Sequence, residues 1–195
     1  MQTFLAGAAI GAAFFAMAQR AEALPNVGAE IGVSQRAVDW VEPLLAGFAF
    51  GLHAEMDLGP LVRLGPYYLH YELPSDDRYI YFPEEGAWFA SGTFNTVGLR
   101  SRFFLPLAGS LKPYLVAGFG YTWLRYQLGR VRNYGGHFVE LPIGAGLAYE
   151  VNEKWSISLD AAYRPAVLFG GQTFEGDGHN ASTGTSFLLG VSFSP

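Results

Sequence analysis

The stretch HFVELPIGAGLAYEV, residues 137–151, alternates large apolar side chains with small or charged ones. A period of two is the period of a β-strand whose two faces differ in chemistry. One face of this strand therefore carries bulk, and the other carries mainly glycine, proline and acid. The bulky positions are Val139, Leu141, Ile143, Ala145, Leu147, Tyr149 and Val151, and the alternate ones are Phe138, Glu140, Pro142, Gly144, Gly146, Ala148 and Glu150.

The same alternation recurs from about residue 26 to residue 193, without a helical pattern in between. Eight such strands predict an all-β fold, an antiparallel up-and-down barrel. Short connections alternate with long ones, which is typical of outer-membrane barrels with periplasmic turns and surface loops. The predicted strands are 26–34, 44–56, 61–72, 93–105, 111–126, 137–151, 155–167 and 185–193. The short connections are 57–60, 106–110 and 152–154, and the long ones are 35–43, 73–92, 127–136 and 169–184.

Composition indicates that the bulky face points to lipid. Half of the residues are hydrophobic and only 15% are charged, against roughly 25% in an average soluble domain. Lys112 and Lys154 are the only lysines, whereas soluble β proteins cover their wet face with Lys and Glu. The alternative is a soluble lipocalin-like barrel, which is apolar inside and polar outside. In this chain its solvent face would carry glycines in place of the Lys and Glu that such a face needs.

Charge and cysteine content exclude several functions. A formal net charge of −5 gives nucleic-acid binding no electrostatic support. The chain contains no cysteine, so neither a disulfide framework nor a thiolate metal site is expected. The four histidines show no metal-ligand spacing, and no cofactor fingerprint is found. We therefore expect no metal and no cofactor.

Residues 1–23 form a separate segment. An apolar run over residues 4–18 precedes Ala21-Glu22-Ala23, the pattern of a secretory signal peptide with its cleavage site. The alternative, a membrane anchor helix, needs about 20 apolar residues. The sequence thus predicts a signal peptide over residues 1–23 and one barrel domain over residues 24–195.

The small face of the strands carries glycines and charged residues. In an eight-stranded barrel the interior is just wide enough to be filled by side chains. Glycines leave room there, and Arg pairs with carboxylates through its planar fork. We expect a polar network that plugs the lumen, formed by Glu30, His53, Glu55, His70, Glu72, Arg100, Arg102, Glu140, Asp160 and Arg164.

Aromatic residues fall at predicted strand ends, where interfacial girdles belong. The predicted outward face of strand 61–72 carries Tyr67, Leu69 and Tyr71. Pro66 and Pro165 predict a bulge or shortened pairing, since proline lacks the amide of a ladder bond. The expected girdle consists of Tyr71, Trp123, Tyr149, Trp155 and Phe193.

Three segments resemble a known family. LKPYLVAGFGY (residues 111–121) is similar to the Pro-Tyr-x-x-x-Gly-x-Gly-Tyr stretch of opacity-protein and outer-membrane-protein-A-like barrels. PIGAGLAYEVNEKWSISLDAAYRP (142–165) resembles their next hairpin, and TSFLLGVSF (185–193) resembles their closing strand. The resemblance implies an eight-stranded barrel in the bacterial outer membrane, surrounded by lipid and lipopolysaccharide. It also implies that the insertion machinery recognises the closing strand, although Ser194-Pro195 follows Phe193 here.

The expected function is structural or interactive: surface loops that support envelope integrity or adhesion. Loop 73–92 mixes aromatic residues with carboxylates and is the candidate for a surface ligand, unless its rings pack on the barrel rim. One alternative is an enzyme that modifies lipid A or phospholipid, and another is a narrow channel for small hydrophobic molecules.

The candidate catalytic pair is His179 and Ser182, in GDGHNAST (residues 176–183). It is similar to the His-x-Ser-Asn motif of lipid A deacylases, but Ser stands at +3 and not at +2. On a strand, that spacing would place the two side chains on opposite faces. In a loop, the same residues are ordinary turn formers.

Overall fold

The computed structural model describes residues 24–38, 46–73, 81–82, 86–87, 90–128, 132–170 and 182–195. This part of the chain consists of β-strands joined by turns and irregular segments. Among these residues, no helix is long and apolar enough to cross a membrane. The strands are β1 (Asn26–Val38), β2 (Gly47–Asp57), β3 (Val62–Leu73), β4 (Tyr81–Phe82), β5 (Gly86–Ala87), β6 (Ala90–Phe104), β7 (Leu111–Leu128), β8 (Arg132–Glu140), β9 (Ile143–Glu150), β10 (Trp155–Gly170) and β11 (Ser182–Phe193).

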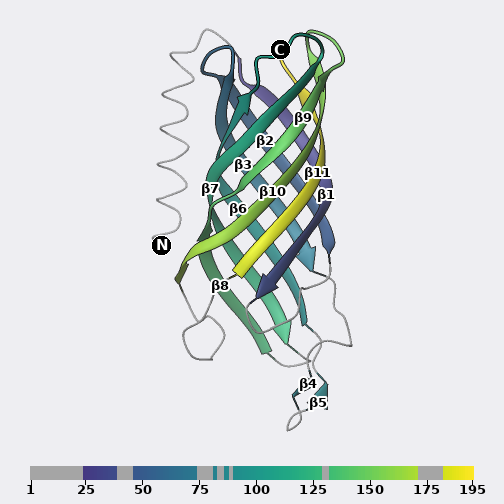
Figure 1. Cartoon of the computed structure of the whole chain (residues 1–195). Coiled ribbons are helices and arrows are strands. Elements are labelled where there is room, and N and C mark those ends of the chain that lie inside the picture. Colours follow the sequence, from purple (N-terminus) through teal and green to yellow (C-terminus); the bar gives the residue numbers. More distant parts are fainter. Residues whose placement is uncertain are drawn as a thin grey trace.

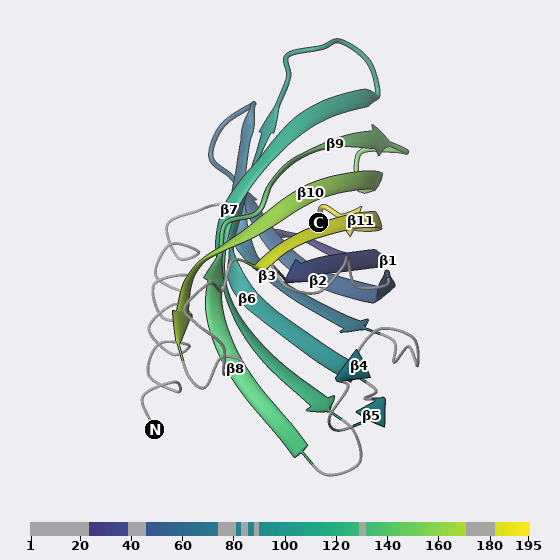
Figure 2. The same ribbon diagram turned by 60° about the horizontal axis from the view of Figure 1, so that its bottom comes forward.

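The strands close into a barrel (Figure 1 and Figure 2). Every pairing is antiparallel, and β11 pairs with β1 from Val27↔Phe193 to Val38↔Ser182, which joins the two ends of the sheet. β8 and β9 both lie between β7 and β10, so they form the two halves of one wall strand. With β1, β2, β3, β6, β7, β10 and β11, this pair makes the predicted wall of eight strands.

Prolines interrupt the wall where the sequence predicts it, and at one further position. Pairing of β2 with β3 lapses beside Pro66, between His53↔Tyr67 and Met56↔Leu64. The register of β10 shifts just after Pro165, between Ala166 and Leu168. The further break separates β8 from β9 at Leu141-Pro142, where the carbonyl of Pro142 still accepts the amide of Gly118 at 3.0 Å.

The two ends of the barrel differ. Turns at residues 58–61, 105–110 and 151–154 lie at one end together with the C-terminus, and the β4–β5 hairpin lies at the other end (Figure 1). β1, β8 and β11 extend further toward the second end than predicted, so the predicted loops 35–43, 127–136 and 169–184 are partly strand. Polar residues and glycines there lack the apolar alternation, but neighbouring strands still hydrogen-bond their backbone.

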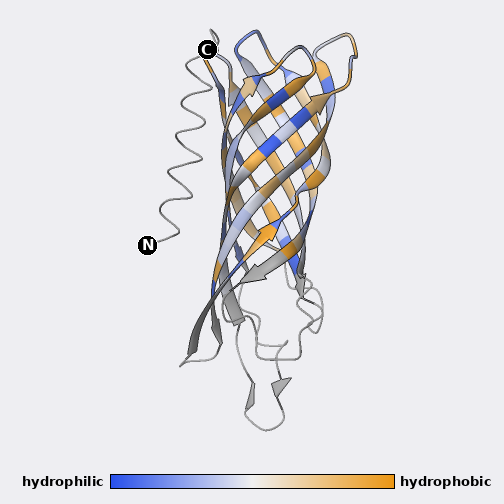
Figure 3. Cartoon of the chain, turned by 90° about the vertical axis from the view of Figure 1, so that its left-hand side faces the viewer, coloured by the Kyte–Doolittle hydropathy of each residue, from blue (hydrophilic) through white to orange (hydrophobic). Residues whose placement is uncertain are grey.

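The outer face of the wall is apolar. Ile143, Leu159, Phe187 and Phe48 are 56–58% exposed, although each is a large hydrophobic residue. Along each strand these residues alternate with polar or small ones, as the colours in Figure 3 show. A surface of this kind is typical of a barrel that is surrounded by lipid.

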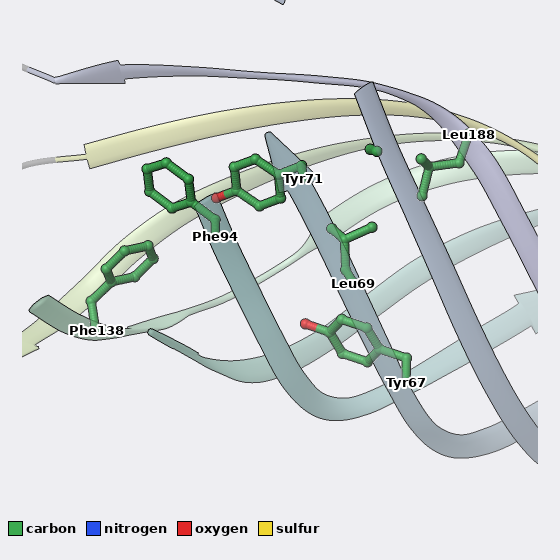
Figure 4. Packing of buried hydrophobic residues seen from close by; sticks show 7 residues of the cluster. Tyr67, Leu69, Tyr71, Phe94, Phe138 and Leu188 are labelled. Carbon is green, nitrogen blue, oxygen red and sulfur yellow. The ribbon is translucent and has the colours of Figure 1, made fainter. Parts of the chain in front are cut away.

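Strand β3 is the exception to the predicted orientation. Tyr67, Leu69 and Tyr71 are 4%, 1% and 0% exposed and point into the lumen, so the prediction that they face outward is wrong (Figure 4). Glycines on β6 and β7 leave room for the reversed side chains. A Cβ atom on Gly98 would lie 2.7 Å from Cε1 of Tyr67, and one on Gly120 would meet the same ring. The lumen therefore accepts large rings wherever the facing strands lack side chains.

Candidate functional site: the lumen and the barrel ends

The lumen contains two groups of buried charged side chains, one toward each end of the barrel. We call the group nearer the turns the short-turn cluster; it comprises Glu30, His53, Glu55, Arg100, Arg102 and Asp160. The group nearer the β4–β5 hairpin is the long-loop cluster, made of Arg36, Tyr71, Glu140, Arg164 and Ser186. All of these residues are buried.

In the short-turn cluster two guanidinium groups share three carboxylates. Arg100 contacts both oxygens of Glu30, at 2.9 and 3.2 Å, and its Nε donates to Glu55 at 3.0 Å. Arg102 donates to Glu30 at 2.7 Å and to Asp160 at 3.4 Å. His53 lies 3.2 Å from Glu30 through Nδ1 and 3.2 Å from Ser192 Oγ through Nε2. The contacts connect strands from opposite sides of the barrel.

In the long-loop cluster two guanidinium groups share one carboxylate. Arg36 donates to one oxygen of Glu140 at 2.8 Å, and Arg164 donates to the other at 2.7 Å. Arg36 also donates to Tyr71 Oη at 2.8 Å, and Arg164 to Ser186 Oγ at 3.0 Å. The guanidinium carbon of Arg36 lies 4.5 Å from the ring centre of Phe138. Aromatic faces thus complete the surroundings of this cation.

Uncharged side chains occupy the space between the two clusters. Thr96 and Thr122 are joined by a 2.7 Å hydrogen bond, and both are fully buried. The Tyr67 ring lies between Arg100 and Arg164, 5.9 and 5.6 Å from their guanidinium carbons. Leu69 and Leu188 belong to the same buried hydrophobic cluster as Tyr67 (Figure 4). Counted together, the clusters hold four guanidinium groups and four carboxylates, so their formal charges balance.

Most residues expected in the lumen are found there, but two are not. Glu30, His53, Glu55, Arg100, Arg102, Glu140, Asp160 and Arg164 are all buried inside. His70 and Glu72 instead lie on the outer face of β3, with side chains 19% and 62% exposed, so their prediction was wrong. Since Tyr67, Leu69 and Tyr71 point inward, the alternate residues of the same strand must point outward.

Sequence reasoning also missed Arg36. It lies in the predicted loop 35–43, yet it continues the inward series Glu30, Gly32, Ser34 of β1. That continued period of two was the signal that could have revealed it.

Aromatic residues at the short-turn end lie on the outer face. Tyr149 and Trp155 are 52% and 47% exposed, and the Trp155 ring lies 4.9 Å from that of Phe193. Trp123 faces outward further along β7 and is 36% exposed. Tyr71 is the exception, because it is fully buried and bonded to Arg36, so its assignment to the girdle was wrong.

The predicted catalytic pair cannot be placed as a pair. His179 lies outside the described residues, and Ser182 begins β11 opposite Val38. Most of loop 73–92 also lies outside them; the described residues of this range are the end of β3, strands β4 and β5, and the start of β6. Within the part of the chain that is described, no three His, Cys, Asp or Glu side chains are grouped so that they could hold a metal ion.

A closed antiparallel wall with an apolar exterior and buried charged side chains in its interior defines a transmembrane β-barrel of the bacterial outer membrane. The chain matches the family model of the outer membrane protein beta-barrel domain over residues 6–194, and it belongs to that family. The protein is therefore located in the bacterial outer membrane, as the segments at 111–121, 142–165 and 185–193 had suggested.

Solved structures of small outer-membrane barrels share the fold. Neisserial surface protein A (NspA) matches with a TM-score of 0.68 at 14% identity, covering 88% of this chain and 97% of its own. Ail, the attachment invasion locus protein of Yersinia pestis, gives 0.57 at 14%, with coverages of 89% and 99%. A major outer membrane protein from Thermus thermophilus gives 0.53 at 15%, with 85% and 98%. A search of curated protein sequences finds no significant match.

Proposed function

We propose that this protein is a rigid scaffold that holds surface loops for contact with partners outside the cell, and so supports envelope integrity or adhesion. The observation that carries the proposal is the set of buried ion pairs that cross the lumen. Ion pairs join β1 to β6 and to β8 across the interior, through Glu30–Arg100 and Arg36–Glu140. Ion pairs between the wall strands hold the strand ends at fixed distances from one another, and the loops start from these strand ends.

The buried side chains in the lumen also favour a scaffold over a narrow channel. In planar bilayers, we expect the purified barrel to give almost no conductance, because side chains occupy the path between the clusters. Steady single-channel steps would contradict the scaffold and favour a channel for small molecules. A Glu140→Gln variant measured beside it shows whether any current depends on the long-loop cluster.

The candidate contact surface is loop 73–92. It carries four acidic residues (Asp76, Asp77, Glu84 and Glu85), one basic residue, and several Tyr, Phe and Trp side chains. A second solved structure of Ail, with a TM-score of 0.53, is a complex with the heparin analogue sucrose octasulfate, a polyanion. An acidic loop favours the opposite partner, a basic protein surface, since like charges repel.

Adhesion to immobilised basic protein tests this surface. We expect most of the binding to be lost in a variant in which the four acidic residues of the loop, Asp76, Asp77, Glu84 and Glu85, are changed to Asn or Gln. Raised salt should weaken the binding of the unmodified protein, because it screens charge–charge attraction. A variant with Glu150→Gln, at the short-turn end, is the matched control and should bind normally. Equal binding by the loop variant would overturn the assignment.

Export and insertion complete the proposal. Cleavage after Ala23 would leave only Leu24 and Pro25 before β1, and the closing strand β11 ends at Phe193. We expect the mature protein to begin at Leu24 by N-terminal sequencing. Phe193→Ala should slow assembly by the insertion machinery in membranes, measured as delayed appearance of the heat-modifiable band.

A further inference from the structure

Polar side chains form a hydrogen-bonded group on the outer face of the wall, over β3 and β6. We call it the outer-wall cluster; it comprises Tyr68, His70, Glu72 and Asn95, and the Phe50 ring packs against it. Tyr68 Oη donates to Asn95 Oδ1 at 2.7 Å, and His70 Nδ1 lies 2.9 Å from the same oxygen. Because a carbonyl oxygen only accepts, Nδ1 carries the proton in that bond. His70 Nε2 then faces Glu72 Oε1 at 3.5 Å.

The cluster lies near the edge of the apolar band that is further from the short turns. The outward residues of β3 begin with Val62 and Leu64, and those of β6 include Phe103 and Leu99, all apolar. His70 is eight residues along β3 from Val62. With a rise of about 3.3 Å per residue and a strand tilt of about 40°, it lies roughly 20 Å from the short-turn end. An apolar band about 25 Å tall places this position close to the headgroups of the outer leaflet.

The geometry of the cluster is fixed by the sheet. Phe50 pairs with His70, and His70 pairs with Asn95, so the three side chains lie side by side on neighbouring strands. The Phe50 ring packs on the His70 ring at 5.0 Å and meets the Tyr68 ring edge-on at 5.9 Å. A group held by strands and packed rings needs little ordering when it binds a ligand.

The chemistry of the cluster selects its ligand. Glu72 is 62% exposed and offers a carboxylate that accepts hydrogen bonds. Within the described residues the amide nitrogen of Asn95 has no hydrogen-bond partner, so it is available as a donor. An acceptor and a donor beside aromatic rings match the hydroxyl groups and apolar face of a sugar ring. A phosphate fits less well, because the carboxylate of Glu72 repels an anion. Arg125 of β7 lies on the same face but is separated from Glu72 by Thr93 of β6.

We propose that the outer-wall cluster binds the sugar headgroup of a glycolipid in the outer leaflet. Glu72 accepts a sugar hydroxyl, and the Asn95 amide donates to a ring substituent. Tyr68 and His70, both on β3, hold the carbonyl oxygen of Asn95 in place. This site is on the wall and not on the loops, so it goes beyond the adhesive function proposed above and does not depend on it.

Native mass spectrometry of the folded barrel tests the proposal. The protein is released from a detergent without sugar groups and titrated with an uncharged monoglycosyl diacylglycerol or with phosphatidylethanolamine. We expect Asn95→Leu and Glu72→Gln each to weaken binding of the glycolipid by about fivefold to tenfold, the effect of losing one hydrogen bond. Binding of phosphatidylethanolamine should not change.

Tyr68→Phe provides a milder variant and has a matched control. It removes only the hydroxyl that supports Asn95, and we expect a loss of about twofold to fivefold. Tyr163 is also outward, 49% exposed on β10, and its hydroxyl has no partner within the described residues, so Tyr163→Phe should bind like the unmodified protein. Equal binding by Tyr68→Phe and Tyr163→Phe, or equal losses with both lipids, overturns the proposal. So does dimer formation that depends on the same residues, since it would assign the surface to a second copy.

Discussion

The short-turn cluster and the long-loop cluster each bury two guanidinium groups, but their surroundings differ. In the short-turn cluster, Glu30, Glu55 and Asp160 share the two cations. In the long-loop cluster, Glu140 serves both Arg36 and Arg164, and the rings of Phe94, Phe138 and Tyr71 surround Arg36. The first arrangement spreads its contacts over several anions, whereas the second centres on a shared one.

This difference shows two ways to bury an arginine inside a membrane barrel. Removing a cation from water is costly unless its charge and its hydrogen bonds are both satisfied. Several carboxylates achieve this in the short-turn cluster. In the long-loop cluster, one carboxylate accepts at both oxygens, and aromatic faces and hydroxyl groups add to it. The two clusters should therefore respond differently when one carboxylate loses its charge.

The largest effect is expected for Glu140→Gln. The side chain keeps its shape and one acceptor, but Arg36 and Arg164 lose the anion that they share. Breaking a buried pair in this way costs about 3–5 kcal/mol. Urea unfolding in lipid vesicles, followed by tryptophan fluorescence, measures the loss. A cost below about 1 kcal/mol would show that the cluster is stable without the shared anion.

Glu55→Gln is the matched change in the short-turn cluster. Arg100 and Arg102 keep Glu30, and Arg102 keeps Asp160, so both cations retain an anion. We expect a loss of about 1–3 kcal/mol, mostly from weakened hydrogen bonds. The same unfolding measurement applies. A cost equal to that of Glu140→Gln would contradict the idea that the short-turn cluster is redundant.

The sequence predicts the barrel because lipid outside and a polar interior impose one rule along every strand: large apolar side chains point outward, and small or charged ones point inward. Ile143 and Glu140 follow that rule, and alternation alone assigns their faces correctly. β3 breaks it, because an interior lined by glycines such as Gly98 accepts a tyrosine as readily as a charge. The size of a side chain then does not predict which face of the strand it lies on. The face is set by the register of β3 with β2 and β6.

The partners of each charged residue were harder to predict than its position. Burial of Glu140 follows from the period of two, but its bonds to Arg36 and Arg164 depend on the register of three wall strands. The outer-wall cluster was missed for a related reason. His70 and Glu72 were expected inside, and the contact of His70 with Asn95 depends on pairing between β3 and β6, which one sequence does not specify.

Phe138→Leu tests the aromatic part of the comparison. The ring centre lies 4.5 Å from the Arg36 guanidinium carbon, and the side chain is 2% exposed. We expect a cost of about 1–2 kcal/mol from the lost cation–π contact and the smaller volume. In the background of Glu140→Gln the same change should cost more, because Arg36 then depends more heavily on the rings. Strictly additive losses in this double-mutant cycle would argue against such compensation.

The smallest effect is expected for Glu150→Gln, the same chemical change at the surface of the short-turn end. Glu150 contacts Lys112 at 3.8 Å, and the two side chains are 47% and 29% exposed. Water solvates both charges, so the pair contributes less than about 1 kcal/mol. Added salt should reduce even that difference between Glu150→Gln and the unmodified protein, and should leave the cost of Glu140→Gln nearly unchanged. If salt altered both variants equally, the lumen would be open to ions, and the distinction between a filled interior and a wet rim would fail.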